Sequence, residues 1–284
     1  MIAELLGSLV EAYSTEGTTR SHSKEKAVEM YRDELLSLLS SGMEAPTLAM
    51  KTAGLQGAVN LCHIDGFLSA EEVSFLVQKV NELLLQLDFE DLRWVWRTIL
   101  QWPALTHVGR KSALEGLVSI AKLTRKPIEE ITLPLLFGKL PDTAPPLDDE
   151  VKRLEYKHIL ASVSVLCALP GLLELMILRT LSRLENLASS EQATNAADVD
   201  PVTRECNAAY AYSLLHSLLL TIRRKIQNGD LDVAKHFDTI VPRLFDYFVT
   251  GAVSRAKEPI RTDVRLLSAA ASIIETITQT LSKE

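Results

Sequence analysis

The chain of 284 residues is longer than most single globular cores, so its length predicts either two domains or an elongated array. Hydrophobic residues make up 47% and charged residues 24%, which excludes a largely disordered protein, and 12 glycines with 11 prolines are too few for an all-β fold rich in tight turns. Leucine and alanine dominate and favour helices, while the net charge of −7 disfavours non-specific binding to nucleic acid or anionic membranes.

Helical periodicity recurs along the whole sequence, and no segment shows the alternation of a half-buried strand. Three helix starts have a local cause. Ser69 and Glu72 stand at the spacing of a capping box, Asp200 precedes a proline at a first helical position, and Pro127 opens another helix in the same way. The predicted helices span 1–13, 24–41, 44–63, 69–101 with a break near Asp88, 107–124, 127–140, 149–168, 170–188, 203–227, 230–250 and 260–282.

Three connections between these helices are long and polar, namely 14–23, 141–148 and 188–200. We expect the last of them to be mobile and readily cleaved by proteases, because nothing in its composition constrains it. The helical pattern resumes unchanged after each connection, so none is typical of a linker between independent domains. The remaining connections are short, which predicts antiparallel neighbours.

Two patterns recur within the chain. The segment 53–59 resembles 113–118 and shares a glycine with it, and 131–137 resembles 239–245. Each of the second pair carries a proline inside an apolar helix, where proline costs about 3 kcal/mol unless a bend is wanted. A bent helix with proline followed by a helix rich in alanine and leucine resembles the HEAT repeat.

These patterns predict an all-α fold, an α-solenoid of about five HEAT-like helical hairpins in a right-handed superhelix. Such repeats bury their apolar faces against their neighbours, so stability is expected to add along the array. We expect a single array over 1–284, with hairpins at about 24–63, 69–124, 127–168, 170–227 and 230–282. The residues expected in its core are Leu135, Leu166, Leu215, Leu219, Ile240 and Ile274.

The cysteines do not predict a disulfide framework or a metal knuckle, because there are three of them at wide spacings and a reducing compartment explains them best. They are Cys62, Cys167 and Cys206. The first residues carry an early acid and no basic segment, which argues against a secretory signal. The longest apolar stretch, 159–178, contains Pro170-Gly171 and a charge, so it predicts two buried helices rather than a membrane span.

No catalytic, cofactor-binding or metal-binding motif is found in the sequence. Serines lie outside nucleophile elbows, no phosphate-binding glycine loop occurs, and the six histidines lack ligand spacing. Cys62-His63 is a weak metal candidate, because adjacent helical residues point about 100° apart. His216 lies among leucines, so we expect a core or near-core histidine bonded to a backbone carbonyl.

An aromatic and basic cluster lies at 93–97. Trp94 falls off the apolar stripe of its helix, and Arg93 and Arg97 flank it. Packing against the next repeat is one interpretation. The other is an exposed contact patch for a protein partner, because tryptophan and arginine are enriched at binding hot spots.

Charge is distributed unevenly over the predicted helices. Helices assigned to an outer layer hold 11 basic and 18 acidic residues, whereas those assigned to an inner layer (44–63, 107–124, 149–168, 203–227 and 260–282) hold 13 and 8. Because solenoids bind partners on one extended surface, a basic inner layer predicts an acidic partner surface, with ordinary scatter as the alternative. The basic residues involved are Arg110, Lys111, Lys122, Lys152, Arg153, Lys157, Arg223 and Arg224.

One stretch carries a family resemblance. A helix ending in Leu140-Pro141-Asp142 is followed by a proline-rich loop, a helix led by Tyr156 and a leucine–cysteine–alanine turn at 166–168. This sequence pattern resembles the targeting adaptor of cytosolic iron–sulfur cluster assembly. That HEAT-repeat family was first named for methyl methanesulfonate sensitivity and is linked to nucleotide excision repair and transcription. Members of that family are several times longer, so the resemblance implies a fragment.

The resemblance implies a scaffold without catalytic residues that brings apo-proteins, including DNA polymerases and helicases, to the cluster-loading complex. The function predicted here is therefore a non-enzymatic adaptor with protein partners and no cofactor, working in the cytoplasm and nucleus without direct nucleic-acid or membrane binding. The alternative from the same physical class is a nuclear-transport or phosphatase-type HEAT scaffold. An enzyme would need a convergent polar pocket that the sequence does not assemble.

Overall fold

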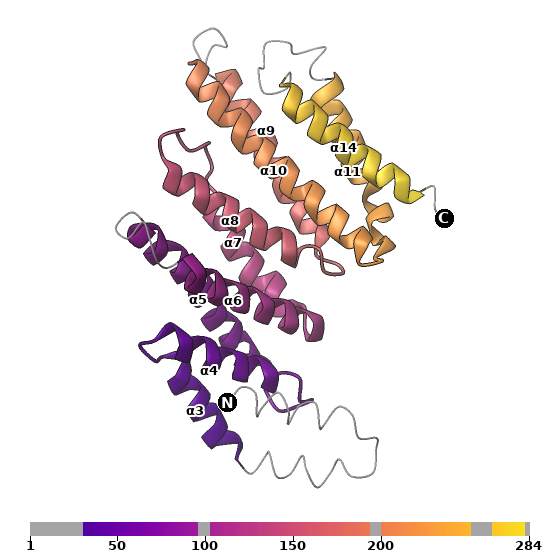
Figure 1. The fold of residues 1–284 in the computed structure, drawn as a ribbon. Coiled ribbons are helices and arrows are strands. Elements are labelled where there is room, and N and C mark those ends of the chain that lie inside the picture. Colours follow the sequence, from indigo (N-terminus) through magenta and orange to yellow (C-terminus); the bar gives the residue numbers. More distant parts are fainter. Residues whose placement is uncertain (1–30, 96–102, 194–199, 251–262, 282–284) are drawn as a thin grey trace. The chain divides into compact units, whose positions relative to one another are not determined.

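The computed structural model describes residues 31–95, 103–193, 200–250 and 263–281 (Figure 1). Over these residues the chain is helical with short connections and contains no strand, which confirms the predicted all-α class. The chain divides into two compact units, Met1–Pro134 and Leu135–Glu284, and the boundary falls inside one short helix. The predicted helix over 1–13 and the connection over 14–23 lie outside the described residues.

The described helices follow the predicted order closely. The first unit contains α3 (Arg32–Met43), α4 (Leu48–Leu61), α5 (Ala70–Val95), α6 (Pro103–Leu123), the π-helical turn η1 (Ile128–Thr132) and the start of α7 (Leu133–Lys139). The second contains the rest of α7, then α8 (Glu150–Leu166), α9 (Leu173–Ala193), α10 (Pro201–Gln227), the 3₁₀ turn η2 (Leu231–His236), α11 (Phe237–Phe245), the π-helical turn η3 (Asp246–Thr250) and α14 (Val264–Leu281).

The predicted helix starts have the expected local structure. The Ser69 N–H donates to Glu72 Oε2 at 2.8 Å, and Ser69 Oγ accepts from the Glu72 N–H at 3.2 Å, which is the reciprocal pair of a capping box. Pro201 occupies the first turn of α10, where its missing N–H has no helical partner to lose. Asp149 caps α8 by accepting from the Lys152 N–H at 3.0 Å.

Two predicted boundaries are wrong. The helix α5 runs through Asp88 without a break, because no glycine or proline interrupts it there. The helix α9 continues to Ala193 instead of ending near residue 188, and the Ser189 hydroxyl donates to the Glu185 carbonyl within this extra turn at 2.8 Å. The rest of the connection that we expected to be mobile, 194–199, lies outside the described residues.

The two internal prolines lie beside π-helical turns, as bent helices require. Pro134 is the second residue of α7, which follows η1, and Pro242 lies inside α11, which continues into η3. A proline has no N–H to donate to the carbonyl four residues earlier, and its ring clashes with that carbonyl in a regular helix. A π-helical turn changes the local spacing of the backbone, so the helix bends and continues instead of ending.

Within each unit, alternate helices lie side by side in one layer. On the second unit, Ser217 Oγ donates to the Leu160 carbonyl at 3.0 Å and Thr221 Oγ1 donates to Ser164 Oγ at 3.0 Å, both across 57 residues. A constant sequence separation shows that α8 and α10 run parallel and in register. On the first unit, α4 and α6 are related in a similar way, because His63 Nε2 and Ser119 Oγ are 2.8 Å apart across 56 residues.

The other helices of the second unit form the opposite layer. The Arg183 guanidinium on α9 donates to the Phe137 carbonyl on α7 at 2.9 Å and to the Pro141 carbonyl at 2.7 Å. The Tyr247 hydroxyl on η3 donates to the Leu184 carbonyl on α9 at 2.7 Å. The predicted assignment of α7, α9 and α11 to one layer and of α8, α10 and α14 to the other therefore agrees with the contacts in this unit.

Four of the six predicted core residues are buried and two are not. Leu135 is 38% exposed, because Leu133 and Leu136 turn the opposite face of α7 inward. Ile274 is only half-buried, because Ile273 and Ile277 form the buried stripe of α14. The residues that lie in the core as predicted are Leu166, Leu215, Leu219 and Ile240.

The apolar stretch 159–178 forms two separate helices. It is interrupted where Gly171 adopts a φ of 77°, a left-handed conformation that glycine accepts without a steric penalty. None of the described helices is both long enough and apolar enough to cross a bilayer.

Glycines allow the closest helix contacts in the first unit. A Cβ on Gly54 of α4 would lie 2.8 Å from the Met43 nitrogen and 2.9 Å from the Gly42 carbonyl carbon at the end of α3. A Cβ on Gly116 of α6 would lie 3.2 Å from Val59 Cγ2. The recurring glycine predicted from the sequence thus marks a place where α6 packs tightly on α4.

We predict that Gly54→Ala destabilises the protein by about 1–3 kcal/mol, because its new methyl group meets backbone atoms that cannot rotate away. Gly138→Ala on α7 is the matched control. Nothing lies within 4 Å of its Cβ position, so it should stabilise the helix by about 0.5–1 kcal/mol. Chemical denaturation of both variants measures the difference, and equal effects would contradict the close approach of α3 and α4.

A second prediction compares two leucines that the sequence places in the core. Leu166→Ala should cost about 2–5 kcal/mol, because Leu166 is fully buried. Leu135→Ala should cost less than about 1 kcal/mol, because this side chain lies partly in solvent. Urea unfolding curves provide the measurement, and a similar loss for both variants would show that the register of α7 is wrong.

Candidate functional site

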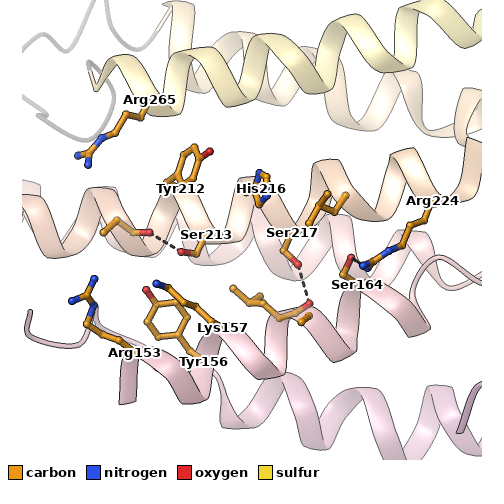
Figure 2. Close-up of a pocket in the computed structure, with 14 residues that line it drawn as sticks. Arg153, Tyr156, Lys157, Ser164, Tyr212, Ser213, His216, Ser217, Arg224 and Arg265 are labelled. Carbon is orange, nitrogen blue, oxygen red and sulfur yellow. Dashed lines mark hydrogen bonds between the residues drawn. The ribbon is translucent and has the colours of Figure 1, made fainter. Parts of the chain in front are cut away.

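A groove opens on the second unit between the parallel helices α8 and α10, with the start of α14 at one end (Figure 2). Its volume is about 480 Å³, and most of its accessible lining is apolar. This size is within the range of about 300–1,000 Å³ that is usual for ligand sites. All of its lining residues belong to the second unit.

Small side chains at helical spacing create the groove. On α10, Ala209, Ser213 and Ser217 follow one another every four residues, and on α8 Ala161 and Ser164 lie opposite them. Residues three or four apart share one helix face, so these positions remove bulk from both facing surfaces at once. The hydroxyls of Ser213 and Ser217 are satisfied by backbone carbonyls, at 2.9 and 3.0 Å.

Aromatic rings and a leucine form the apolar part of the lining. Tyr156 is buried and packs edge to face on Tyr210 of α10, with ring centroids 4.9 Å apart. Leu160 is buried beside it. Tyr212 and His216 lie one turn apart on α10 and stack with an interplanar angle of 14° and a centroid distance of 5.6 Å. The expected core histidine is thus half-buried, and its ring faces the groove beside Tyr212.

Three of the predicted basic residues meet at this groove. Arg153 donates to the Leu147 carbonyl at 3.0 Å, Arg224 donates to Ser164 Oγ at 2.6 Å, and Lys157 is exposed (Figure 2). None of the three has a carboxylate partner among the described residues, and no acidic residue lines the groove. The groove is therefore locally positive on a chain whose net charge is −7.

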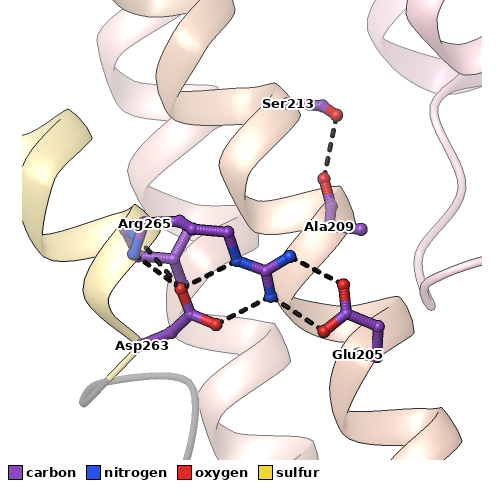
Figure 3. A network of polar contacts seen from close by, with 6 residues as sticks. Glu205, Ala209, Ser213, Asp263 and Arg265 are labelled. Carbon is purple, nitrogen blue, oxygen red and sulfur yellow. Dashed lines mark hydrogen bonds and ion pairs between the residues drawn. The ribbon is translucent and has the colours of Figure 1, made fainter.

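A fourth cation, Arg265 at the start of α14, is fully paired (Figure 3). Its guanidinium donates to both carboxylate oxygens of Glu205 at 2.7 and 2.9 Å and to Asp263 at 2.8 and 3.2 Å. Hydrogen bonds from Arg265 hold the pKa of both carboxyl groups below their usual range. This network more than compensates the charge of Arg265, because two carboxylates surround one guanidinium, and it joins the start of α14 to α10.

We predict that Arg265→Gln destabilises the protein near neutral pH by at most about 1 kcal/mol, since the network is half exposed. The folded pKa values of Glu205 and Asp263 are depressed, so their contribution is present above the unfolded values of about 4 and is lost as the pH falls through the folded values. Thermal unfolding from about pH 7 to about pH 3 should therefore show a difference that shrinks on acidification. A difference independent of pH would contradict this linkage.

The other predicted basic residues do not join the groove. Lys152 pairs with Asp149 at 3.0 Å, and Arg223 is exposed one position away from Arg224 but does not line the groove. The remaining three lie on α6 in the first unit: Lys111 approaches Glu115 at 3.7 Å, Arg110 is half-buried with polar contacts, and Lys122 is exposed in the last turn.

The predicted contact patch of Arg93, Trp94 and Arg97 is not described by the structure. Arg97 lies outside the described residues, and the side chains of the other two are likewise outside them, although their backbone belongs to α5.

Two of the cysteines have raised thiol pKa values. Burial raises the pKa of the Cys62 thiol to about 11 and that of the Cys167 thiol to about 12, so both are protonated near neutral pH and are poor nucleophiles or ligands. The ring of His63 bonds to Ser119. Over the part of the chain that the structure describes, no three histidine, cysteine or acidic side chains gather at a metal-binding distance.

Sequence reasoning missed two features of this site. Arg265 was assigned to the basic layer only as part of the charge total, and Tyr212 was not singled out. Both residues line the groove, Tyr212 from α10 and Arg265 from the start of α14. The spacing of Tyr212 and His216, four residues on one helix, is the signal that indicates a shared face.

Stacked helical hairpins with a groove between parallel helices define the class of helical, repeat-like scaffolds. Residues 159–284 match the family model MMS19_C, described as RNAPII transcription regulator C-terminal. This match confirms the resemblance predicted from the sequence: residues 159–284 are similar to the C-terminal region of that family. A search of curated protein sequences gave no match.

Proposed function

We propose that this protein is a non-enzymatic scaffold that binds other proteins through its second unit. The observation that carries the proposal is the family match over 159–284, which covers most of the groove. The groove offers an apolar floor, stacked aromatic rings and three cations without carboxylate partners among the described residues, which are features of protein-binding surfaces.

More specifically, we propose that the protein is an adaptor in the cytoplasm and nucleus. It would link apo iron–sulfur proteins to the cytosolic cluster-assembly machinery. The helices are then about five HEAT-like hairpins of one right-handed α-solenoid. This role comes from the family resemblance. The raised thiol pKa values agree with it, because a scaffold of this kind brings proteins together and need not hold the cluster itself.

We predict that the tagged full chain, expressed in cells of its source organism, co-purifies with cluster-assembly factors and with iron–sulfur client enzymes identified by mass spectrometry. The matched control is Leu215→Asp, which places a charge at a fully buried position of α10 and should abolish specific recovery by unfolding the second unit. Capture that persists with the control would be non-specific.

Recovery of nuclear-transport cargo or of phosphatase subunits instead would favour the alternative HEAT scaffold and contradict the adaptor role. Turnover of a small molecule by the purified chain, lost in a groove variant that remains folded, would contradict a non-enzymatic function.

A further inference from the structure

We propose that the groove between α8 and α10 binds an extended acidic segment of a partner protein, with one carboxylate toward each end of the groove and an apolar side chain between them. This inference rests on the proposed protein-binding function and names the chemistry of the ligand.

The charge of the groove selects an acidic ligand. Arg153 and Arg224 donate only to neutral oxygens, and the exposed Lys157 has no carboxylate partner among the described residues. Their charge is therefore not compensated locally. Lys152, one residue from Arg153, is compensated by Asp149, and Arg265 is compensated by two carboxylates. A ligand carboxylate therefore gains most at the three groove cations.

The positions of these cations set the spacing of the ligand. Lys157 and Ser164 are seven residues apart on α8, which is about 10 Å along the helix axis. Arg224 reaches the Ser164 end, because its guanidinium bonds to Ser164 Oγ at 2.6 Å. An extended peptide covers this distance in about three residues, and its side chains at i and i+3 point to opposite sides. Lys157 on α8 and Arg224 on α10 lie on the two helices that flank the groove, so each can receive one of these side chains. The ligand therefore carries acidic residues at positions i and i+3.

The apolar middle of the groove receives the side chain between the two acids. Ala161 and Ser213 leave space there, and the stacked rings of Tyr212 and His216 form a flat wall (Figure 2). An aromatic or large aliphatic side chain fits this surface, because offset stacking and apolar burial both favour it. A nucleic acid fits less well, because three cations on an acidic chain give little phosphate neutralisation.

The test measures binding of a fluorescent peptide, Gly-Ser-Asp-Phe-Ser-Asp-Ser-Gly, to the full chain by fluorescence anisotropy at low salt. A double variant, Lys157→Gln with Arg224→Gln, should weaken binding by about tenfold through the loss of two partly exposed ion pairs. The matched control is Lys152→Gln with Arg223→Gln, which removes the same charge from neighbouring positions of the same two helices. This control should bind within about twofold of the wild type.

Two further comparisons separate the contribution of the peptide's carboxylates to binding from that of its phenylalanine. A peptide with asparagine in place of both aspartates should bind to the wild type as weakly as the acidic peptide binds to the groove variant. Added salt should weaken the binding of the acidic peptide and leave that of the asparagine peptide unchanged. Replacing the phenylalanine by serine should weaken binding without changing the salt dependence. Circular dichroism should be the same for all variants.

Equal affinity of the groove variant and the control variant, or no binding of the acidic peptide to the wild type, would overturn the inference. Displacement of the peptide by a single-stranded oligonucleotide at low concentration would also overturn it. If the groove variant still recovers cluster-assembly factors from cells, the scaffold function stands and the groove is not its site. If the peptide binds as expected while no such factor is recovered, the adaptor role fails and the groove remains an acidic-peptide site.

Discussion

The parallel register of α8 and α10 is the constraint on which the groove depends. Hydroxyl groups hold it: Ser217 donates to the Leu160 carbonyl, and buried Thr221 donates to Ser164 one turn further along. Because both bonds span the same number of residues, a slip of either helix would break them together. The same register brings the small residues of the two helices opposite each other and opens the space between them.

Polar side chains also fix the connections around this pair. Lys225, fully buried near the end of α10, pairs with Asp230 and Asp232 and donates to the Leu169 carbonyl in the turn before α9. At the other end, the Tyr210 hydroxyl donates to the Pro141 carbonyl at 2.7 Å. Each interaction joins segments far apart in sequence, so the loops are held by buried charges and hydroxyls as well as by apolar packing.

The groove is locally positive although the whole chain is negative, because the basic residues that line it are not all paired with carboxylates. Lys152 and Arg265 form ion pairs with nearby carboxylates. Arg153 and Lys157 on α8 and Arg224 on α10 belong to a lining without carboxylates. A surface of this kind attracts an acidic partner at short range while the overall negative charge repels polyanions at long range.

The sequence by itself determined the helical class, most helix boundaries and the capping box at Ser69, because these follow from interactions over a few residues. It also indicated irregular helices near the two prolines, where the structure has π-helical turns. It further indicated a basic helix layer and the family resemblance, since both depend on composition and local sequence patterns. Only the tertiary structure decided which basic residues meet. Arg153, Lys157 and Arg224 converge through contacts across about sixty residues, and Lys152 and Arg223 beside them do not, because adjacent helical residues point about 100° apart. The same geometry separates buried Leu136 from exposed Leu135.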